Sequence, residues 1–136
     1  MKNGSFKTIK AIIAAALLIS AAAIALTCFL PGILINRLYG ECGDDLDKAV
    51  AAALEERNDI AYLHIQTVCG RLEKSKKLLM VFYDHNKIIE LTGSAGTALE
   101  LAKTKDTAQL ITELCDIEKA FDYLIHTNDA GLYNVF

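Results

Sequence analysis

The feature that most constrains this chain is an uncharged, apolar segment near its N-terminus. Residues 11–36 carry no charged side chain, and Ala11–Leu30 alone supplies twenty residues that are almost all apolar. At about 1.5 Å per residue, a helix of that length spans roughly 30 Å, the thickness of the hydrocarbon core of a bilayer. The sequence therefore predicts a transmembrane anchor at residues 11–36, preceded by a basic N-terminal segment at residues 1–10.

A cleaved signal sequence is the alternative interpretation of this segment, because a basic stretch precedes the apolar run. The run is far longer than the roughly 7–15 apolar residues of a signal sequence, and its small residues at 20–23 are followed by further apolar sequence. A lipoprotein site at Cys28 fits less well, since Thr27 stands where Gly, Ala or Ser is expected. An uncleaved anchor is therefore favoured.

Basic residues flank the apolar segment unequally. Lys2, Lys7 and Lys10 precede it, whereas Arg37 alone follows it closely, and acidic residues begin at Glu41. Because the cytoplasmic flanks of membrane helices carry an excess of Lys and Arg, we expect the N-terminus in the cytoplasm. The predicted location is thus the cell membrane, with a single pass and an extracytoplasmic C-terminal domain.

The rest of the chain predicts one small all-α domain at residues 44–136, joined to the anchor by a juxtamembrane linker at residues 37–43. Its apolar residues recur at helical spacing. Four helices are expected, at residues 44–56, 59–83, 85–103 and 106–126. Short connections imply antiparallel neighbours. The predicted fold is therefore an N-terminal transmembrane helix followed by a small antiparallel helical bundle of two αα-hairpins.

Each expected helix carries an apolar stripe that we predict to face the core. The stripes are Leu46, Val50, Ala53 and Leu54; Ala61, Ile65, Val68, Leu72, Leu79 and Phe82; Ile88, Leu91, Ala95, Ala98 and Ala102; and Leu110, Leu114, Ile117, Phe121 and Leu124. Asp59, Asp84 and Asp106 are predicted to cap the second, third and fourth helices, because a carboxylate can accept hydrogen bonds from the unpaired N–H groups there.

A faint internal repeat relates two parts of this domain. The residues Ala51, Leu54, Asp59, Ala61 and Leu63 recur as Ala98, Leu101, Asp106, Ala108 and Leu110, at one offset of 47 residues. One interpretation is two helical hairpins of shared geometry, each with an aspartate cap and an alanine where the helices cross closely. The alternative is that any two helical hairpins select similar residues at these places.

Several of these residues also resemble a known family. The stretch Leu79–His85, the following Ile88, the Lys105-Asp106 turn and the tail Leu132–Phe136 look like the family called domain of unknown function 4363. Its members are small proteins of Firmicutes with one N-terminal membrane span and a helical domain. The resemblance implies that architecture and implies no activity.

The charge of the domain bears on its partners. From Glu41 onward the chain has 10 basic and 17 acidic residues, a net charge of about −7. Nucleic acid is a poor partner for such a domain, because its binding depends on neutralised phosphates, and an anionic lipid surface should repel it. The basic cluster Arg71, Lys74, Lys76 and Lys77 is interpreted as a solvated face or, alternatively, as a docking patch for an acidic partner.

Asp84 and His85 are the most tempting candidates for chemistry, since an aspartate can orient an imidazole for base catalysis or metal binding. Adjacent residues on a helix do not face each other, so a cap followed by the first helical residue is favoured. His64 and His126 stand in no metal-binding spacing with other residues. We therefore expect no catalytic residues, no metal, no cofactor and no identifiable small-molecule substrate.

The four cysteines leave several possibilities open. Cys28 lies in the apolar segment, and Cys42, Cys69 and Cys115 lie in the predicted extracytoplasmic part. An intermolecular bond at Cys42, a bridge between Cys69 and Cys115, and unpaired core thiols are the alternatives, of which core thiols are favoured.

Together these features predict a membrane-tethered helical binding or scaffold module of the cell envelope. Its expected partner is another membrane or cell-envelope protein, or a second copy of the chain. The alternative from another class is a cell-envelope enzyme. It would be a hydrolase or a thiol redox enzyme that uses His85 or cysteines. An assembly subunit of a multi-pass membrane complex is a further alternative.

Overall fold

A computed structural model describes the backbone of residues 2–133 and the side chains of residues 6–127. Four helices form this part of the chain: α1 (Lys2–Leu54), α2 (Asn58–Phe82), α3 (His85–Thr104) and α4 (Thr107–Tyr133). The described part contains no strand, so the all-α prediction is confirmed. The last three residues of the predicted tail motif, 134–136, lie outside the described residues.

The chain divides into two compact units, Met1–Leu30 and Pro31–Phe136. The first unit is the N-terminal part of α1, and every described side chain from Phe6 to Thr27 is exposed. This is the part of the described chain that is long and apolar enough to cross a membrane. The hydroxyl groups of Ser20 and Thr27 donate to backbone carbonyls one turn earlier, so their polar groups are satisfied within the helix.

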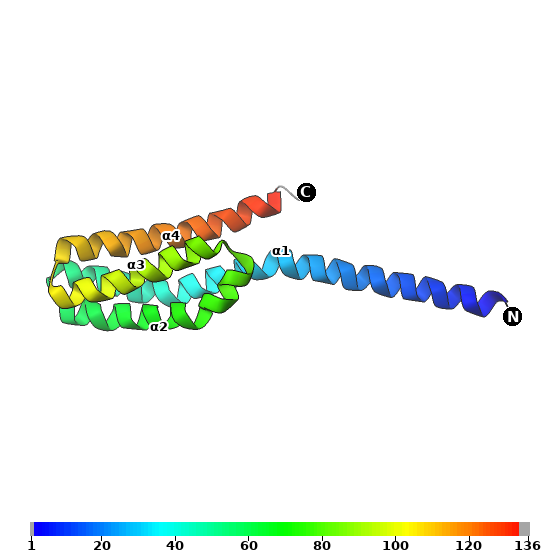
Figure 1. The fold of residues 1–136 in the computed structure, drawn as a ribbon, viewed down its shortest axis with the longest axis horizontal. Helices are drawn as coiled ribbons and strands as arrows, with labels where there is room; N and C mark the ends of the chain where they lie inside the picture. Colours follow the sequence, from blue (N-terminus) through cyan, green and yellow to red (C-terminus); the bar gives the residue numbers. More distant parts are fainter. Residues whose placement is uncertain (1, 134–136) are drawn as a thin grey trace. The chain divides into compact units, whose positions relative to one another are not determined.

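In the second unit the helices lie side by side, and short connections join successive helices at alternate ends (Figure 1). Buried residues recur on each helix mainly at alternating steps of three and four, the seven-residue repeat of coiled-coil bundles. They are Ile35, Leu38, Cys42, Leu46, Ala49 and Ala53 on α1; Ala61, Ile65, Val68, Leu72 and Leu79 on α2; Ile88, Leu91, Ala95, Ala98 and Ala102 on α3; and Leu110, Leu114, Ile117, Phe121 and Leu124 on α4. The stripes predicted for the third and fourth helices are confirmed.

The predicted linker at residues 37–43 is wrong, because this segment belongs to α1. Apolar spacing carries the helix through it, and its inward-facing side chains belong to the bundle core together with one just before it. These core residues are Ile35, Leu38 and Cys42. The bundle therefore begins at Pro31 rather than at residue 44, and the exposed apolar segment ends earlier than predicted.

Three residues predicted for the core are not fully buried. Leu54 is 66 % exposed at the end of α1, and Val50 and Phe82 are only partly buried. Ala49 takes the core position predicted for Val50, because the stripe of α1 keeps the seven-residue register that Leu46 and Ala53 share. Phe82 is the last residue of α2, where the chain already turns toward α3.

The proposed repeat at an offset of 47 residues does not relate equivalent positions. Ala61 is buried whereas Ala108 is exposed, and Leu63 is 59 % exposed whereas Leu110 is buried. This offset is not a multiple of seven, so it moves each residue out of the register of the core stripe. The five identities therefore do not mark a shared geometry.

An offset of 49 residues does relate equivalent positions, because it equals seven complete repeats. Glu56 and Lys105, separated by this offset, lie in the connections after α1 and α3 and have positive φ angles of 59° and 61°. Asn58 and Thr107 share the offset and touch each other, with Asn58 Nδ2 donating to Thr107 Oγ1 at 3.3 Å. Asn58 is 5 % exposed, and its Oδ1 has no hydrogen-bond partner in the described chain.

Candidate functional site

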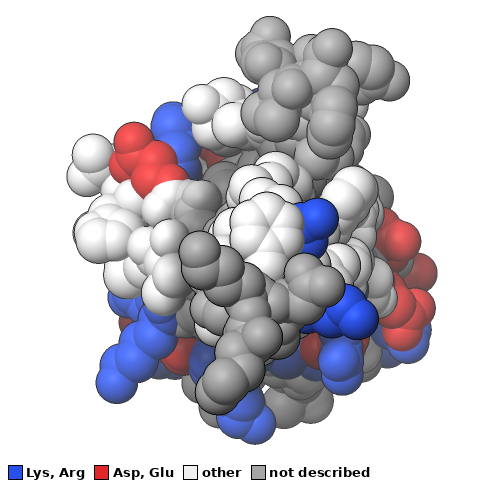
Figure 2. Space-filling view, turned by 90° about the vertical axis from the view of Figure 1, so that its right-hand side faces the viewer, with Lys and Arg blue, Asp and Glu red and all other residues white. Residues whose placement is uncertain are grey.

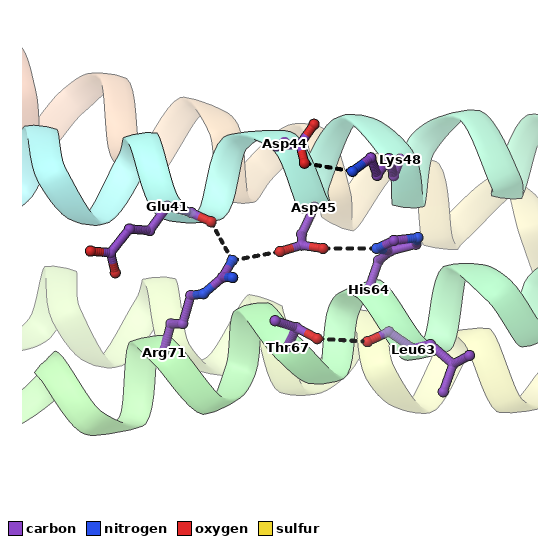
Figure 3. Close-up of polar contacts among 8 residues, drawn as sticks. All are labelled: Glu41, Asp44, Asp45, Lys48, Leu63, His64, Thr67 and Arg71. Atoms are coloured by element: carbon purple, nitrogen blue, oxygen red, sulfur yellow. Dashed lines mark hydrogen bonds and ion pairs between the residues drawn. The ribbon is translucent and has the colours of Figure 1, made fainter.

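A polar cluster of Asp45, His64 and Arg71 joins α1 to α2 (Figure 3). Asp45 on α1 accepts from both partners on α2: its Oδ1 lies 2.8 Å from Nδ1 of His64, and its Oδ2 accepts from Nη1 of Arg71. The same Arg71 nitrogen also donates to the backbone carbonyl of Glu41. We call these three side chains the Asp45 cluster.

The sequence alone does not reveal this cluster, because its members are far apart in the chain and form no motif. One signal was present. Glu56 lies midway between Asp45 and Thr67 in the sequence. If the two helices run antiparallel from a turn at Glu56, Thr67 therefore stands opposite Asp45. His64 and Arg71 stand one helical turn to either side of Thr67. Two donors on α2 are thereby brought to one carboxylate on α1.

The electrostatics of the cluster favour a charged Asp45. Burial of this carboxyl, whose side chain is 16 % exposed, raises its pKa, but hydrogen bonds from His64 and Arg71 and the charge of Arg71 outweigh that effect. The pKa of Asp45 is therefore lower than its ordinary value, and the group is ionised at neutral pH. A charged acceptor strengthens both hydrogen bonds and fastens α1 to α2.

The pair of Asp45 and His64 has the geometry in which a carboxylate orients an imidazole for base catalysis. The nearby groups do not extend it toward a nucleophile. Thr67 Oγ1 donates to the carbonyl of Leu63 at 3.1 Å. Cys42 is fully buried, and burial raises the pKa of its thiol to about 11, so this thiol stays protonated at neutral pH. With the groups described, the Asp45 cluster holds α1 and α2 together.

The predicted basic docking patch is divided by the fold. Arg71 is turned inward to Asp45, and Lys76 pairs with Glu73 at 3.4 Å with 31 % of its side chain exposed. Lys74 and Lys77 are exposed and form no ion pair with any described residue. Two lysines thus remain available of the four basic residues predicted as a patch.

The structure places Asp84 at the N-cap of α3, where its Oδ1 accepts from the backbone N–H of Asn86 at 2.7 Å. His85 turns to another helix end, because its Nε2 donates to the carbonyl of Met80 in the last turn of α2 at 2.9 Å. The two side chains therefore serve different backbone groups. Each satisfies a helix terminus that would otherwise keep unpaired polar groups.

Asp106 directly precedes α4, and its Oδ1 accepts from the backbone N–H of Gln109 at 3.2 Å. The cap predicted for Asp59 is wrong: Arg57 stands at the N-cap of α2, with no side-chain hydrogen bond to the helix. The helix begins at Asn58, one residue earlier than expected, so Asp59 falls inside its first turn. The negative charge of Asp59 there still interacts favourably with the positive end of the helix dipole.

All four cysteines are unpaired thiols, so Cys69 and Cys115 form no bridge. Cys69 Sγ instead donates to the carbonyl of Ala95 on α3 at 3.3 Å, and burial raises the pKa of this thiol. Among the described residues, no group of three His, Cys, Asp or Glu side chains could hold a metal ion.

An open groove of about 360 Å³ lies between α3 and α4. Its two lysines are each paired with a carboxylate on the same helix: Lys87 with Glu90 at 2.8 Å and Lys119 with Asp116 at 2.9 Å. Because positive and negative groups alternate along its walls, the groove presents no concentrated charge to a small ligand.

Comparison with protein-family models, curated proteins and solved structures yields no match to this chain. The resemblance to the family called domain of unknown function 4363 is not tested by these comparisons and stays a prediction.

Proposed function

We propose that this chain is a membrane-tethered helical binding or scaffold module of the cell envelope. The observation that supports it is the contrast between a fully exposed apolar helix and a bundle that has its own buried core. Burying one large apolar side chain contributes about 1.5–3 kcal/mol. The first unit exposes many of them, including Phe6, Ile12, Leu17, Leu18, Ile19, Ile24 and Leu26, which suits a lipid environment and not water.

The proposal has the N-terminus in the cytoplasm and the second unit outside it. Lys7 and Lys10 precede the apolar segment, while acidic residues dominate after Arg37, and this asymmetry favours that orientation. In the proposal the second unit is a pair of αα-hairpins, α1–α2 and α3–α4. Its partner is another membrane or cell-envelope protein or a second copy of the chain.

Insertion and orientation are tested on full-length chain in cells. The chain should resist extraction by alkaline carbonate, and Leu17→Lys with Leu18→Lys should release it, because two charges in the hydrocarbon are unfavourable. A membrane-impermeant maleimide should label Thr97→Cys in intact protoplasts and Lys7→Cys only after permeabilisation. Wild-type chain measures the background from native thiols. The reverse labelling order would contradict the orientation.

Binding is tested by placing a photo-crosslinking amino acid at exposed positions of the bundle in intact cells. Gln66 and Thr97 are exposed, and Ile65 is a buried control on the same helix as Gln66. A binding module should give a discrete adduct from at least one exposed position and none from Ile65. A correctly folded, inserted chain without any adduct from exposed positions scanned along all four helices would refute the proposal.

A further inference from the structure

The helix α2 changes its charge along its length. Residues 58–69 contain the acidic Asp59 and no Lys or Arg. Residues 70–82 contain one acidic residue, Glu73, and all four members of the basic cluster. The bundle part of α1 has its acidic residues near its middle, at Glu41, Asp44, Asp45 and Asp47, and the connection that follows adds Glu55 and Glu56 at the far end. In the view of Figure 2, basic side chains are most frequent in the lower half, and acidic side chains lie at the upper left, at the right and among the basic ones.

The basic end of α2 is the end that adjoins the first residue of the bundle. Tyr83 directly follows α2, and its hydroxyl donates to the carbonyl of Pro31 at 3.0 Å. Pro31 in turn follows Leu30, where the exposed apolar segment ends. This end of the bundle is therefore one peptide bond from the proposed anchor, whatever angle the bundle adopts.

One face of the last turns of α2 combines charge with apolar side chains. Lys74, Lys77, Leu78 and Val81 are spaced at i, i+3, i+4 and i+7, so they share one side of the helix. Leu78 is 47 % exposed and Val81 is 71 % exposed. Of the large apolar side chains exposed on the described second unit, those near this end are Ile33, Leu78, Val81, Ile89 and Tyr123, and those farther away are Leu54 and Leu63.

We propose that this face binds the anionic lipid surface of the membrane that holds the anchor. Lys74 and Lys77 pair with lipid phosphates, and Leu78 and Val81 enter the boundary between headgroups and acyl chains. Each lysine near such a surface strengthens binding by about fivefold. The inference rests on the proposed membrane anchor. It also changes the expectation drawn from net charge, because many acidic residues lie at the far end of the bundle, beyond the screening length of about 10 Å, where an anionic lipid surface repels them little.

The test uses full-length chain reconstituted into vesicles, with a nitroxide label at Val81→Cys. Collisions of the label with dissolved oxygen, which enters the bilayer, are compared with collisions with a water-soluble nickel complex. In phosphatidylglycerol vesicles we expect oxygen collisions to dominate. In phosphatidylcholine vesicles, at raised salt, or in Lys74→Glu with Lys77→Glu, the balance should shift toward the nickel complex. A label at Leu63→Cys, exposed at the far end of α2, should stay aqueous in every case.

Matched variants separate the possible outcomes. Lys103→Glu with Lys105→Glu makes the same charge change at the far end and should leave the Val81 signal as it was. A label at Leu17→Cys, together with carbonate extraction, reports insertion independently. If the span inserts and the Val81 label stays aqueous on phosphatidylglycerol, this inference is overturned and the face belongs to a protein partner, while the anchor stands. If the span does not insert, both proposals fail.

Discussion

The contact between α1 and α2 and the contact between α3 and α4 are built on one seven-residue repeat but are held differently. The first contains small core residues, such as Ala49 and Ala61, and adds the Asp45 cluster across the helices. The second likewise contains small residues on α3, Ala95, Ala98 and Ala102, together with larger ones on α4, and its ion pairs join residues on the same helix. Apolar spacing is thus common to both contacts, and the contact between α1 and α2 adds polar contacts from one helix to the other.

The largest expected effect on stability comes from removing an apolar core side chain. Phe121 on α4 is fully buried, and its ring centroid lies 5.3 Å from that of Tyr39. Phe121→Ala should lower the free energy of unfolding by about 3–5 kcal/mol, because it removes a large side chain and leaves a cavity. Phe82→Ala is the control, with a smaller loss since Phe82 is only partly buried. Urea unfolding of full-length chain in detergent, followed by circular dichroism, measures both, and equal losses would contradict the core assignment.

A smaller effect is expected on the polar side. Asp45→Ala removes the acceptor of two hydrogen bonds and should cost about 1–3 kcal/mol, because His64 and Arg71 lose their shared partner. Asp44→Ala is the matched control one residue away. It breaks the exposed pair with Lys48, whose side chain is 53 % exposed, so it should change stability little. The same urea titration distinguishes them, and indistinguishable midpoints would show that the cluster does not hold α1 to α2.

The two connections also differ at the helix starts that follow them. Asp106→Ala removes the side-chain acceptor at the start of α4 and should cost about 0.5–2 kcal/mol. Asp59→Ala should cost less, since Asp59 contributes only its charge to the first turn of α2. Asp106→Ser should keep most of the stability, because a serine can accept the same hydrogen bond. Thermal melting of the three variants tests this order, and a larger loss at Asp59 would reverse the assignment.

The smallest expected effect is a dependence on acid. The pKa of Asp45 is lower in the folded chain than the ordinary value of about 3.9. Its contribution to stability is therefore complete above that ordinary value and is lost as the pH falls through the lowered one. Unfolding free energies measured between neutral and strongly acid pH should fall less steeply in Asp45→Asn than in wild-type chain. Asp44→Asn should keep the wild-type slope, and a parallel curve for Asp45→Asn would contradict the assignment.

The sequence predicted much of the bundle because spacing alone carries that information. The stripes of α3 and α4 follow directly from apolar residues three and four apart, and Asp84 stands at the helix start where its type and position suggested. Other features depend on contacts between distant residues. A linker was predicted at residues 37–43, but Leu38 and Cys42 pack into the core and keep that segment helical. Asp45 and His64 meet only once α1 and α2 lie together.

Asn58 gives the bundle something that its apolar repeat cannot supply. A stripe repeated every seven residues looks nearly the same after one helix slides along another by one repeat, so burial alone distinguishes such arrangements weakly. Asn58 lies in the stripe of α2, buried, with its amide directed to Thr107. A slid arrangement would set this amide against hydrocarbon, at a cost of about 1–3 kcal/mol for a buried donor without a partner. The contact of Asn58 with Thr107 thus favours one alignment of α2 with α4.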